Sequence, residues 1–557
     1  MMRLLRKLAY ATVTRAARGS SEFTPLGNPR RFAVIAAVLT LLICFPLVLT
    51  SHTPRARLNV MQVVSVLFFL AVIVRHARAA TEAGEFGRTT SSRRGVVLAL
   101  VVGAGVWASM VPFYFISDDF AHLYSARGPL LETLWQFLTE GQAGTFLRPV
   151  GFASIFLDFS LWHTWAPGYH VTNLLLHLVS ITGVFFLCES LGLKAETSTT
   201  ASLVYSVLPV QAEAVAWMGA RFDLLATCLT IWAVTFYVKF RTRGGRGSYG
   251  GALVFFLLAM LSKENAYVLP LLLGLVEFFL LPVRRFKPLL GFLLVGALTF
   301  GYRWSVLGGI GGYSQPGEEA SALHFGFKTF EGLFIRGPTQ LLLGYNWLQP
   351  PTAGVIVLAA LTGAVLLSLA LSAKPEPVGR RLIRFCLAWI VLAILPAHFL
   401  LMVGAGLTNS RVLYLGSVGS ALLVAQLLAG IGPARMRRGA TGFLVLLLSL
   451  GVLHNLGAWR WTSELSRRLL LEVKQLEPSP PPHAEFVFQD MPDRIRGVFF
   501  FHVALPEALN IAYDRQDLSA RRESDFPSGS AADASGRPVI KVKWRGEVEP
   551  LIKPVSP

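Results

Sequence analysis

The stretch Phe115-Ile116-Ser117-Asp118-Asp119-Phe120 closes a long apolar run and opens a polar loop rich in aromatic residues. Two adjacent carboxylates therefore emerge where the chain is predicted to leave a membrane. Like charges side by side at a low-dielectric boundary are unfavourable unless a proton, a cation or a substrate compensates them. Asp118 and Asp119 are functional candidates on this ground, although a pair that only caps the next helix would give the same sequence.

The composition places this pair in a membrane protein. Of 557 residues, 53% are hydrophobic and 15% are charged, and the mean hydropathy of +0.55 is too apolar for a soluble protein of this size. The net charge of +19 comes from short Lys and Arg clusters between apolar runs, which is typical of cytoplasmic loops and excludes a nucleic-acid-binding face. The four cysteines lack paired spacing and predict neither a disulfide framework nor a zinc site.

Apolar runs of spanning length predict an all-α polytopic membrane protein with about thirteen transmembrane helices. Basic residues before the first run place the N-terminus in the cytoplasm, and basic residues recur in nearly every second loop. The predicted spans lie near residues 33–50, 58–74, 96–115, 169–188, 199–217, 222–238, 249–262, 266–281, 288–304, 352–372, 384–403, 412–431 and 440–456.

The chain is predicted to have three parts. Residues 1–95 comprise a cytoplasmic N-terminus and two accessory transmembrane helices, and residues 96–456 form the transmembrane core. Residues 457–557 begin with an amphipathic helix, since apolar residues recur every three or four positions up to Leu476. Several prolines then precede short strand-like pieces, which predict a small outward-facing α/β appendage.

Two long loops of the predicted core face outward, over residues 117–168 and 304–351. The first loop contains short apolar stretches, which suit helices that lie in the membrane interface. The second loop begins with a Gly-rich segment and ends in Tyr345-Asn346-Trp347. It is expected either to cover a site or to be tethered to the interface by its aromatic residues.

Charged and polar residues at the outward ends of the predicted spans gather on one side of the membrane. An outward-facing active site needs such a cluster, and ionisable residues at this depth are unfavourable unless they pair or bind a ligand. The candidates are Asp118, Asp119, Arg148, His170, Glu213, Arg221, Asp223, Lys263, Glu264 and Arg411.

Several of these residues also have a structural interpretation. Glu213, Arg221 and Asp223 lie in one hairpin between two spans, where they either neutralise one another or serve a ligand. Lys263 and Glu264 lie in a tight turn and point either along the membrane surface or into a cleft.

Two further positions have the same ambiguity. Arg411 enters the twelfth predicted span, where an Arg is unfavourable unless it reaches the interface or meets an anion. His170, Asn173 and His177 share one helix face. A histidine in such a place is more often a packing residue than a ligand.

Two acids beside several outward cations suit phosphate binding and hydroxyl activation. A carboxylate removes a proton from the attacking group, while Arg and Lys stabilise a phosphate leaving group. A divalent cation such as Mg²⁺ or Mn²⁺ between Asp118 and Asp119 is the other use of the pair. The sequence leaves both roles open.

Six stretches carry a resemblance to a known family. They are SDDF at 117–120, LRPV at 147–150, HVTNLLLH at 170–177, PVQAEAVAW at 209–217 running into RFDLL at 221–225, LSKE at 261–264, and SRVLYL at 410–415. In this order they resemble the GT-C superfamily of membrane glycosyltransferases, which use polyprenyl-phosphate sugars. Within it the chain is most similar to the transmembrane O-mannosyltransferases that carry tetratricopeptide repeats in animals, and to their bacterial relatives without repeats.

The resemblance covers about residues 96–430 and implies a GT-C-type helical bundle and an inverting sugar transfer. It implies that Asp118 and Asp119 act as base or metal ligand, and that Arg148, Lys263 and Arg411 bind the donor phosphate. The chain departs from the family in three ways. Two spans precede the usual first core helix, no tetratricopeptide period follows, and a Phe stands at position 222 where relatives commonly have a second basic residue.

These observations predict an integral membrane glycosyltransferase. It is expected to move mannose, or a similar hexose or pentose, from a polyprenyl-phosphate donor to a hydroxyl of a protein, lipid or glycan on the outer face of the membrane. The basic loops fit a bacterial inner membrane with a periplasmic active side. The alternatives are a transporter or flippase of lipid-linked glycans, which would carry ionisable residues near mid-membrane, and a catalytically inactive glycan-binding scaffold.

Overall fold

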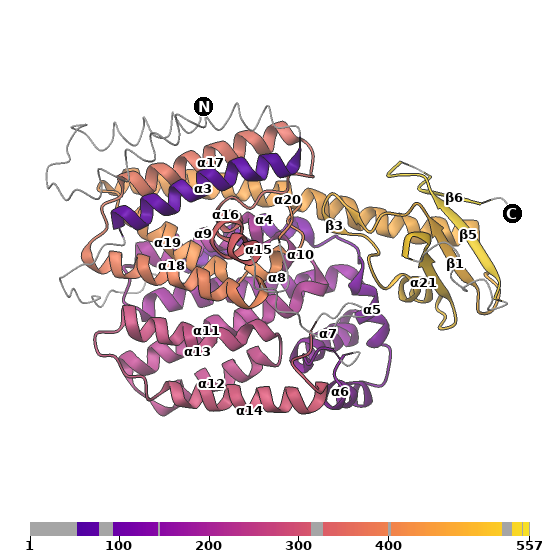
Figure 1. The fold of residues 1–557 in the computed structure, drawn as a ribbon, viewed down its shortest axis with the longest axis horizontal. Helices are drawn as coiled ribbons and strands as arrows, with labels where there is room; N and C mark the ends of the chain where they lie inside the picture. The colour runs from indigo at the N-terminus through magenta and orange to yellow at the C-terminus, as the bar shows by residue number, and fades with distance from the viewer. Residues whose placement is uncertain are drawn as a thin grey trace.

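The computed structural model describes residues 53–76, 93–142, 145–312, 327–398, 403–525, 537–548 and 550–555. In these ranges helices form a large bundle, and a small sheet lies near the C-terminus (Figure 1). Seven described helices are long and apolar enough to cross a membrane. The prediction of a mainly helical integral membrane protein is confirmed. The count of about thirteen spans is not, and the predicted span at 33–50 lies outside the described residues.

The bundle keeps most of the predicted spans as helices, with shifted ends. Its core is most enclosed around α19, in which every residue from Gly416 to Leu428 is buried, as expected for a helix that is apolar all round. The bundle helices are α3 (Pro54–His76), α4 (Arg93–Trp107), α8 (Ala166–Ser190), α9 (Ala195–Ser206), α11 (Arg221–Arg243), α12 (Arg246–Met260), α13 (Leu269–Leu275), α14 (Leu289–Leu307), α16 (Gly337–Leu342), α17 (Thr352–Ser372), α18 (Pro377–His398) and α19 (Gly416–Ala429).

The predicted span at 199–217 is interrupted in the structure. Helix α9 ends at Ser206, and a short turn begins at Pro209, whose ring nitrogen has no proton to continue a helical hydrogen-bond ladder. A second short helix, α10 (Ala212–Ala216), follows and carries Glu213. Every residue from Thr200 to Met218 is buried, so the apolar composition of this interrupted segment matches its place in the core.

The last predicted span and the amphipathic helix after it form one helix, α20 (Ala434–Leu476), of 43 residues. At 1.5 Å per residue it is about 65 Å long, roughly twice the thickness of the hydrocarbon core. Its second half therefore projects from the bundle and reaches the sheet (Figure 1). The sequence contains no proline between the two predicted pieces; the first prolines come only after Leu476.

The C-terminal unit is a small α/β structure, as predicted. Its sheet has the order β4-β1-β5-β6, in which β1 is parallel to β4 and β5, and β6 is antiparallel to β5. Helix α21 (Leu505–Tyr513) contacts β4 and α20, and β2 and β3 form a separate hairpin. The strands are β1 (Glu485–Gln489), β2 (Arg494–Ile495), β3 (Val498–Phe499), β4 (Ser519–Arg522), β5 (Val539–Trp544) and β6 (Ile552–Pro554).

The turn between β2 and β3 fastens the C-terminal unit to the bundle. Asn346 Nδ2 donates a hydrogen bond to the carbonyl oxygen of Arg496 (2.9 Å), and Thr408 Oγ1 donates to that of Gly497 (2.6 Å). On the other side of the unit, the ring of Phe501 stacks on Phe120, with ring centroids 5.6 Å apart. The C-terminal unit therefore packs directly on the segment that carries Asp118 and Asp119.

The aromatic residues at the end of the second predicted outward loop do not tether it to the membrane interface. Tyr345 and Trp347 are each 1% exposed and pack inside the core, so they do not anchor a loop at the membrane interface. Tyr345 OH shares a hydrogen bond of 2.7 Å with Thr362 Oγ1. In the first outward loop the predicted short helices are present as α6 (Leu130–Thr139) and α7 (Pro149–Trp162).

We expect Gly497→Ala to loosen the C-terminal unit. The added Cβ would lie 2.7 Å from the Cα and carbonyl oxygen of Gly406, and Gly497 has a φ of +84° that disfavours a side chain. Backbone atoms cannot move aside cheaply, so we expect a loss of about 1–3 kcal/mol and faster proteolytic release of the unit. Gly546→Ala is the matched control, because its φ is +121° but nothing lies within 4 Å of an added Cβ. Equal effects of the two substitutions would contradict the docking role of Gly497.

Candidate functional site

The two acids of the opening stretch have different environments. Helix α5 (Asp118–Ser125) begins after Ser117, whose φ of +44° interrupts the preceding turn. Asp119 is 1% exposed; its Oδ1 accepts a hydrogen bond from the N–H of Gly219 (2.8 Å) and its Oδ2 one from the N–H of Ile116 (3.0 Å). Asp118 is half-buried, and its one described hydrogen bond is a long contact of 3.4 Å from Ser117 Oγ. Asp119 thus positions the segment, while Asp118 keeps an accessible carboxylate.

Protonation of Asp119 should make stability depend on pH. Burial raises the pKa of Asp119 from its usual 3.8 to about 8, although the two main-chain N–H groups lower it. The folded state then holds the proton more tightly than the unfolded state. The stability from this group is therefore complete below pH about 4 and is lost as the pH rises to about 8. We expect the unfolding temperature of the wild type to fall relative to Asp119→Asn across this window; a difference that does not change with pH would argue against the buried proton.

His122 is a member of the site that the sequence analysis missed. It lies four residues after Asp118 on the same face of α5, and its ring packs between Phe152 and Phe222, with centroids 5.5 and 5.4 Å away. Burial lowers the pKa of His122 to about 4, and the charge of Arg148 acts in the same direction, against that of Asp118. The imidazole is therefore neutral at pH 7 and lies close to both charges. The spacing from Asp118 was the available signal.

One carboxylate holds two arginines beside this helix. Arg148, the residue before α7, donates from Nη2 to Oε2 of Glu264 (2.8 Å) and from Nε to both carboxylate oxygens. Arg303 of α14 pairs with the other oxygen at 3.1 Å. Burial favours the protonated acid, but the nearby charges, Arg148 foremost, lower the pKa of Glu264 to about 2. Glu264 is therefore ionised and keeps both guanidinium groups in place.

A second pair of acids holds Lys263 and Arg411. Asp223 in the first turn of α11 forms an ion pair with Lys263, and its Oδ2 lies 3.7 Å from Nε of Arg411. Glu213 pairs with Nη1 of Arg411 at 2.7 Å. Glu213 also accepts hydrogen bonds from the main-chain N–H groups of Asn409 and Arg411, which fixes the turn that carries the arginine.

The three predicted phosphate ligands are therefore brought together, each with a carboxylate partner. Lys263 and Glu264 adjoin in the chain, so the two sets form one cluster. Counted over the described residues, four cations face three carboxylates, which leaves one positive charge. The cations are Arg148, Lys263, Arg303 and Arg411, and the acids are Glu213, Asp223 and Glu264.

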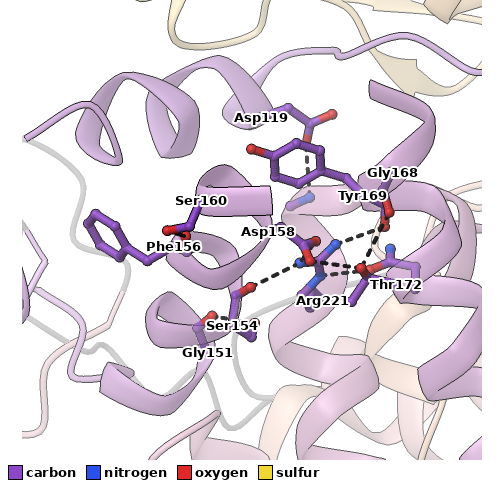
Figure 2. Close-up of polar contacts among 12 residues, drawn as sticks. Asp119, Gly151, Ser154, Phe156, Asp158, Ser160, Gly168, Tyr169, Thr172 and Arg221 are labelled. Carbon is purple, nitrogen blue, oxygen red and sulfur yellow. Dashed lines mark hydrogen bonds and ion pairs between the residues drawn. The ribbon is translucent and has the colours of Figure 1, made fainter. Parts of the chain in front are cut away.

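Arg221 has a structural role behind this cluster. Figure 2 shows its guanidinium between Asp158, Ser154 and Tyr169. Arg221 is 0% exposed, forms a buried ion pair with Asp158, donates to the carbonyl oxygen of Tyr169 (2.8 Å) and to Oδ1 of Asn173 (2.8 Å). These contacts join α7, α8 and α11. The guanidinium is fully buried and donates to protein from Nε, Nη1 and Nη2, so Arg221 is not placed to bind a phosphate.

The polar residues that share one face of α8, which are His170, Asn173 and His177, also have a structural role. His177 Nδ1 lies 2.7 Å from Tyr414 OH, and Asn173 Nδ2 donates to the carbonyl oxygens of Val215 and Trp217 (3.1 Å each). His170 is 2% exposed and packs edge-on against an aromatic ring of the segment before α5. These contacts agree with the interpretation of these three residues as packing residues.

The acid pair does not present the ligand set of a divalent metal. Both oxygens of Asp119 already accept main-chain N–H groups, which leaves Asp118 as the accessible carboxylate of the pair. Over the described part of the chain, no group of three or more His, Cys, Asp or Glu side chains could hold a metal ion. The residues therefore do not fit Mg²⁺ or Mn²⁺ between the two acids.

Comparison with known proteins bears on the predicted family. No family model matches the chain. Protein O-mannosyl-transferase F38B6.6 of Caenorhabditis elegans is 28% identical over 180 residues, which are 28% of this chain and 24% of that protein. Protein O-mannosyl-transferase Tmtc1 of Drosophila melanogaster is 30% identical over 146 residues, which are 26% of this chain and 17% of that protein. The predicted resemblance to O-mannosyltransferases is confirmed. The chain spans a quarter or less of the length of each relative.

Solved structures of glycosyltransferases also align with the chain. ArnT from Cupriavidus metallidurans bound to undecaprenyl phosphate has a TM-score of 0.41 at 14% identity, over 81% of this chain and 94% of that chain. Arabinofuranosyltransferase AftD from Mycobacteria has a TM-score of 0.44 at 14% identity, over 79% of this chain and 32% of that chain. At these scores the likeness is too low to support a conclusion about function.

Proposed function

We propose that this protein is a membrane glycosyltransferase that transfers a sugar from a polyprenyl-phosphate donor to an acceptor hydroxyl. The observation that carries the proposal is an accessible carboxylate beside a cluster of held cations. Asp118 and Arg148 both act on the charge state of His122, which lies close to each. Base and phosphate ligand are therefore neighbours, as a transfer with a phosphate leaving group requires.

In the proposed reaction Asp118 takes the proton of the acceptor hydroxyl. The hydroxyl oxygen attacks the anomeric carbon of the sugar from the face opposite the phosphate, and the bond from that carbon to the phosphate oxygen breaks. The electron pair of the broken bond stays on the polyprenyl phosphate, where Arg148, Lys263 and Arg411 stabilise the added charge. Attack from the opposite face inverts the anomeric configuration.

The carboxylates beside the cations prepare the site for one anion. A polyprenyl-phosphate sugar is a phosphodiester with a single negative charge, and the four cations and three acids of the cluster, with the base Asp118 not counted, leave one positive charge. Glu264, Asp223 and Glu213 hold the side chains in place before the donor arrives, which reduces the ordering that binding requires. The names of the two relatives favour mannose or a similar sugar. The acceptor is a hydroxyl of a protein, lipid or glycan.

The orientation of the chain is part of the proposal. Helix α11 begins at Arg221 beside the cluster and ends with Arg241 and Arg243 at the opposite end of the bundle, where Arg241 pairs with Glu277. Basic residues mark the cytoplasmic side of membrane proteins. The cluster and the C-terminal unit then face outward, toward the periplasm if the membrane is a bacterial inner membrane, and the N-terminus lies in the cytoplasm.

Sugar transfer by the purified protein in lipid nanodiscs tests the proposal. Radiolabelled undecaprenyl-phosphate mannose and a panel of other undecaprenyl-phosphate sugars are offered with an envelope extract as acceptor, with and without EDTA. Labelled acceptor supports the transferase. If no donor is consumed in nanodiscs but labelled lipid crosses the bilayer of proteoliposomes that contain the protein, the flippase alternative replaces the transferase. Loss of transfer in EDTA would restore a metal requirement.

Arg148→Gln is expected to lower kcat/KM by about 100-fold, because a bidentate charged donor to the phosphate is replaced by a neutral amide. Arg148→Lys keeps the charge but loses the bidentate geometry of the guanidinium. Its kcat/KM should fall between those of the wild type and Arg148→Gln. Arg127→Gln is the control, since Arg127 pairs with the exposed Asp514 outside the cluster. Full activity of Arg148→Gln would remove this residue from the donor site.

A further inference from the structure

Two buried polar atoms beside Arg411 have no hydrogen-bond partner among the described residues. One is Nε1 of Trp217, a donor, and the other is Oδ1 of Asp223, an acceptor. Trp217 is 3% exposed and Asp223 is 1% exposed, so neither atom is open to bulk water. Buried polar groups are nearly always hydrogen-bonded, and each exception asks for an explanation. One donor and one acceptor beside the same guanidinium group point to a ligand that has both functions.

The two side chains meet at one guanidinium group. Arg411 Nε lies 3.7 Å from Asp223 Oδ2, and Arg411 Cζ lies 5.1 Å from the ring centroid of Trp217. The indole ring is also fixed by Trp459 and Phe499, with centroids 6.1 and 5.5 Å away. Its orientation is therefore set by packing and not by a hydrogen bond of its own nitrogen.

Gly219 packs closely on the edge of this indole. A Cβ added to Gly219 would lie 2.8 Å from the Trp217 ring and 3.1 Å from Nε1, so a larger residue would push against the edge that carries the indole N–H. The N–H of the same glycine donates to Asp119, so this edge of the indole adjoins the α5 segment. On the other side of the cluster, the side chains of Lys263 and Glu264 are 12% and 30% exposed. A ligand would approach past these two residues.

We infer that Trp217 and Asp223 form a subsite for hydroxyl groups of the transferred sugar. This inference rests on the proposed function, in which Arg411 and Lys263 bind the donor phosphate. The phosphate is bonded to the anomeric carbon, so the sugar hydroxyls lie within a few ångströms of Arg411. A hydroxyl accepts a hydrogen bond from the indole N–H and donates one to the carboxylate.

Other ligands satisfy only half of the pair. A phosphodiester has acceptors and no donor, so it leaves Asp223 Oδ1 unpaired. A cation pairs with the carboxylate and leaves the indole N–H unpaired. A single water molecule satisfies both atoms as well as a sugar does, and the comparison of lipids with and without a sugar distinguishes the two.

The test compares the binding of undecaprenyl-phosphate mannose and of undecaprenyl phosphate to the purified protein in nanodiscs. Trp217→Phe keeps an aromatic ring against Arg411 and removes the N–H. It is expected to weaken binding of the sugar-bearing lipid about tenfold and to leave binding of undecaprenyl phosphate unchanged. Trp347→Phe is the matched control, because its Nε1 is also buried without a described partner but its ring packs against Tyr345. It should change neither affinity.

A second measurement needs no variant. The wild-type protein is offered undecaprenyl-phosphate mannose lacking one hydroxyl at a time, at positions 2, 3, 4 and 6. At least one deoxy sugar should bind about tenfold more weakly than mannose. Equal binding of all the deoxy lipids, or equal weakening of both lipids by Trp217→Phe, would overturn the subsite and leave the transferase proposal in place. If the wild type binds neither lipid, the proposed function fails and the subsite fails with it.

Discussion

Asp118→Asn is expected to lower kcat about 1,000-fold, which lies within the range for loss of a general base. The substitution keeps the size of the side chain but leaves no group that can take the acceptor proton. Because the one described hydrogen bond of Asp118 is the long contact with Ser117, the unfolding temperature should not change. Binding of undecaprenyl phosphate should also persist, since the cations are untouched.

Asp119→Asn is the matched comparison, because it changes the neighbouring acid in the same way. An amide has one acceptor oxygen, so one of the two main-chain N–H groups, of Ile116 or Gly219, loses its partner. At pH 5, where Asp119 is protonated, we expect a loss of about 1 kcal/mol in stability and a smaller loss of activity than in Asp118→Asn. If Asp119→Asn were inactive and stable while Asp118→Asn kept its activity, the two roles would have to be exchanged.

Sequence patterns predicted the outline of the fold because the membrane restricts the choices. A segment in lipid must satisfy its main-chain groups internally, so long apolar runs such as 352–372 and 169–188 are helices in the structure. The same rule does not show that the run at 199–217, which is buried by protein from Thr200 onward, is divided into α9 and α10 by a turn at Pro209. Hydropathy alone does not distinguish burial in protein from burial in lipid.

Which residues would gather was predictable, but which would pair was not. The grouping of Arg148, Lys263 and Arg411 followed from their place at one end of the spans. Their partners come from distant parts of the chain, as in the contact of Arg411 with Glu213, and depend on how the helices pack. The difference between Asp118 and Asp119 has the same origin, because it depends on the N–H of Gly219 about one hundred residues later.

Asp158 and Arg303 were missed although the sequence contained a signal for both. Asp158 directly follows the apolar stretch Phe152-Ala153-Ser154-Ile155-Phe156-Leu157 and precedes another aromatic residue. Arg303 stands near the end of a predicted span. A charge in such a place is unfavourable unless it pairs with an opposite charge, so each of the two residues predicts a partner. Helix α7 has 14 residues and is too short to be counted as a span, so the charge of Asp158 did not stand out as one inside a membrane.

Asp158→Ala is expected to destabilise the protein by about 3–5 kcal/mol, because it leaves the guanidinium of Arg221 buried without its counter-charge. Arg221 and Asp158 have side chains 0% and 3% exposed, so water cannot replace the lost carboxylate. The hydrogen bond from Thr172 Oγ1 to Asp158 Oδ1 (2.7 Å) is lost as well. The measurement is the free energy of unfolding in detergent, obtained from a denaturant titration.

Glu376→Ala is the control for this prediction, because it removes an acid from an ion pair that lies in water. Lys194 and Glu376 have side chains 72% and 74% exposed, and such pairs contribute at most about 1 kcal/mol. Replacing both partners, as in Asp158→Leu with Arg221→Met, should recover much of the stability, since an apolar pair carries no uncompensated charge. A small effect of Asp158→Ala would mean that the Arg221 cluster does not hold α7, α8 and α11 together, and the geometry of the site above it would need another support.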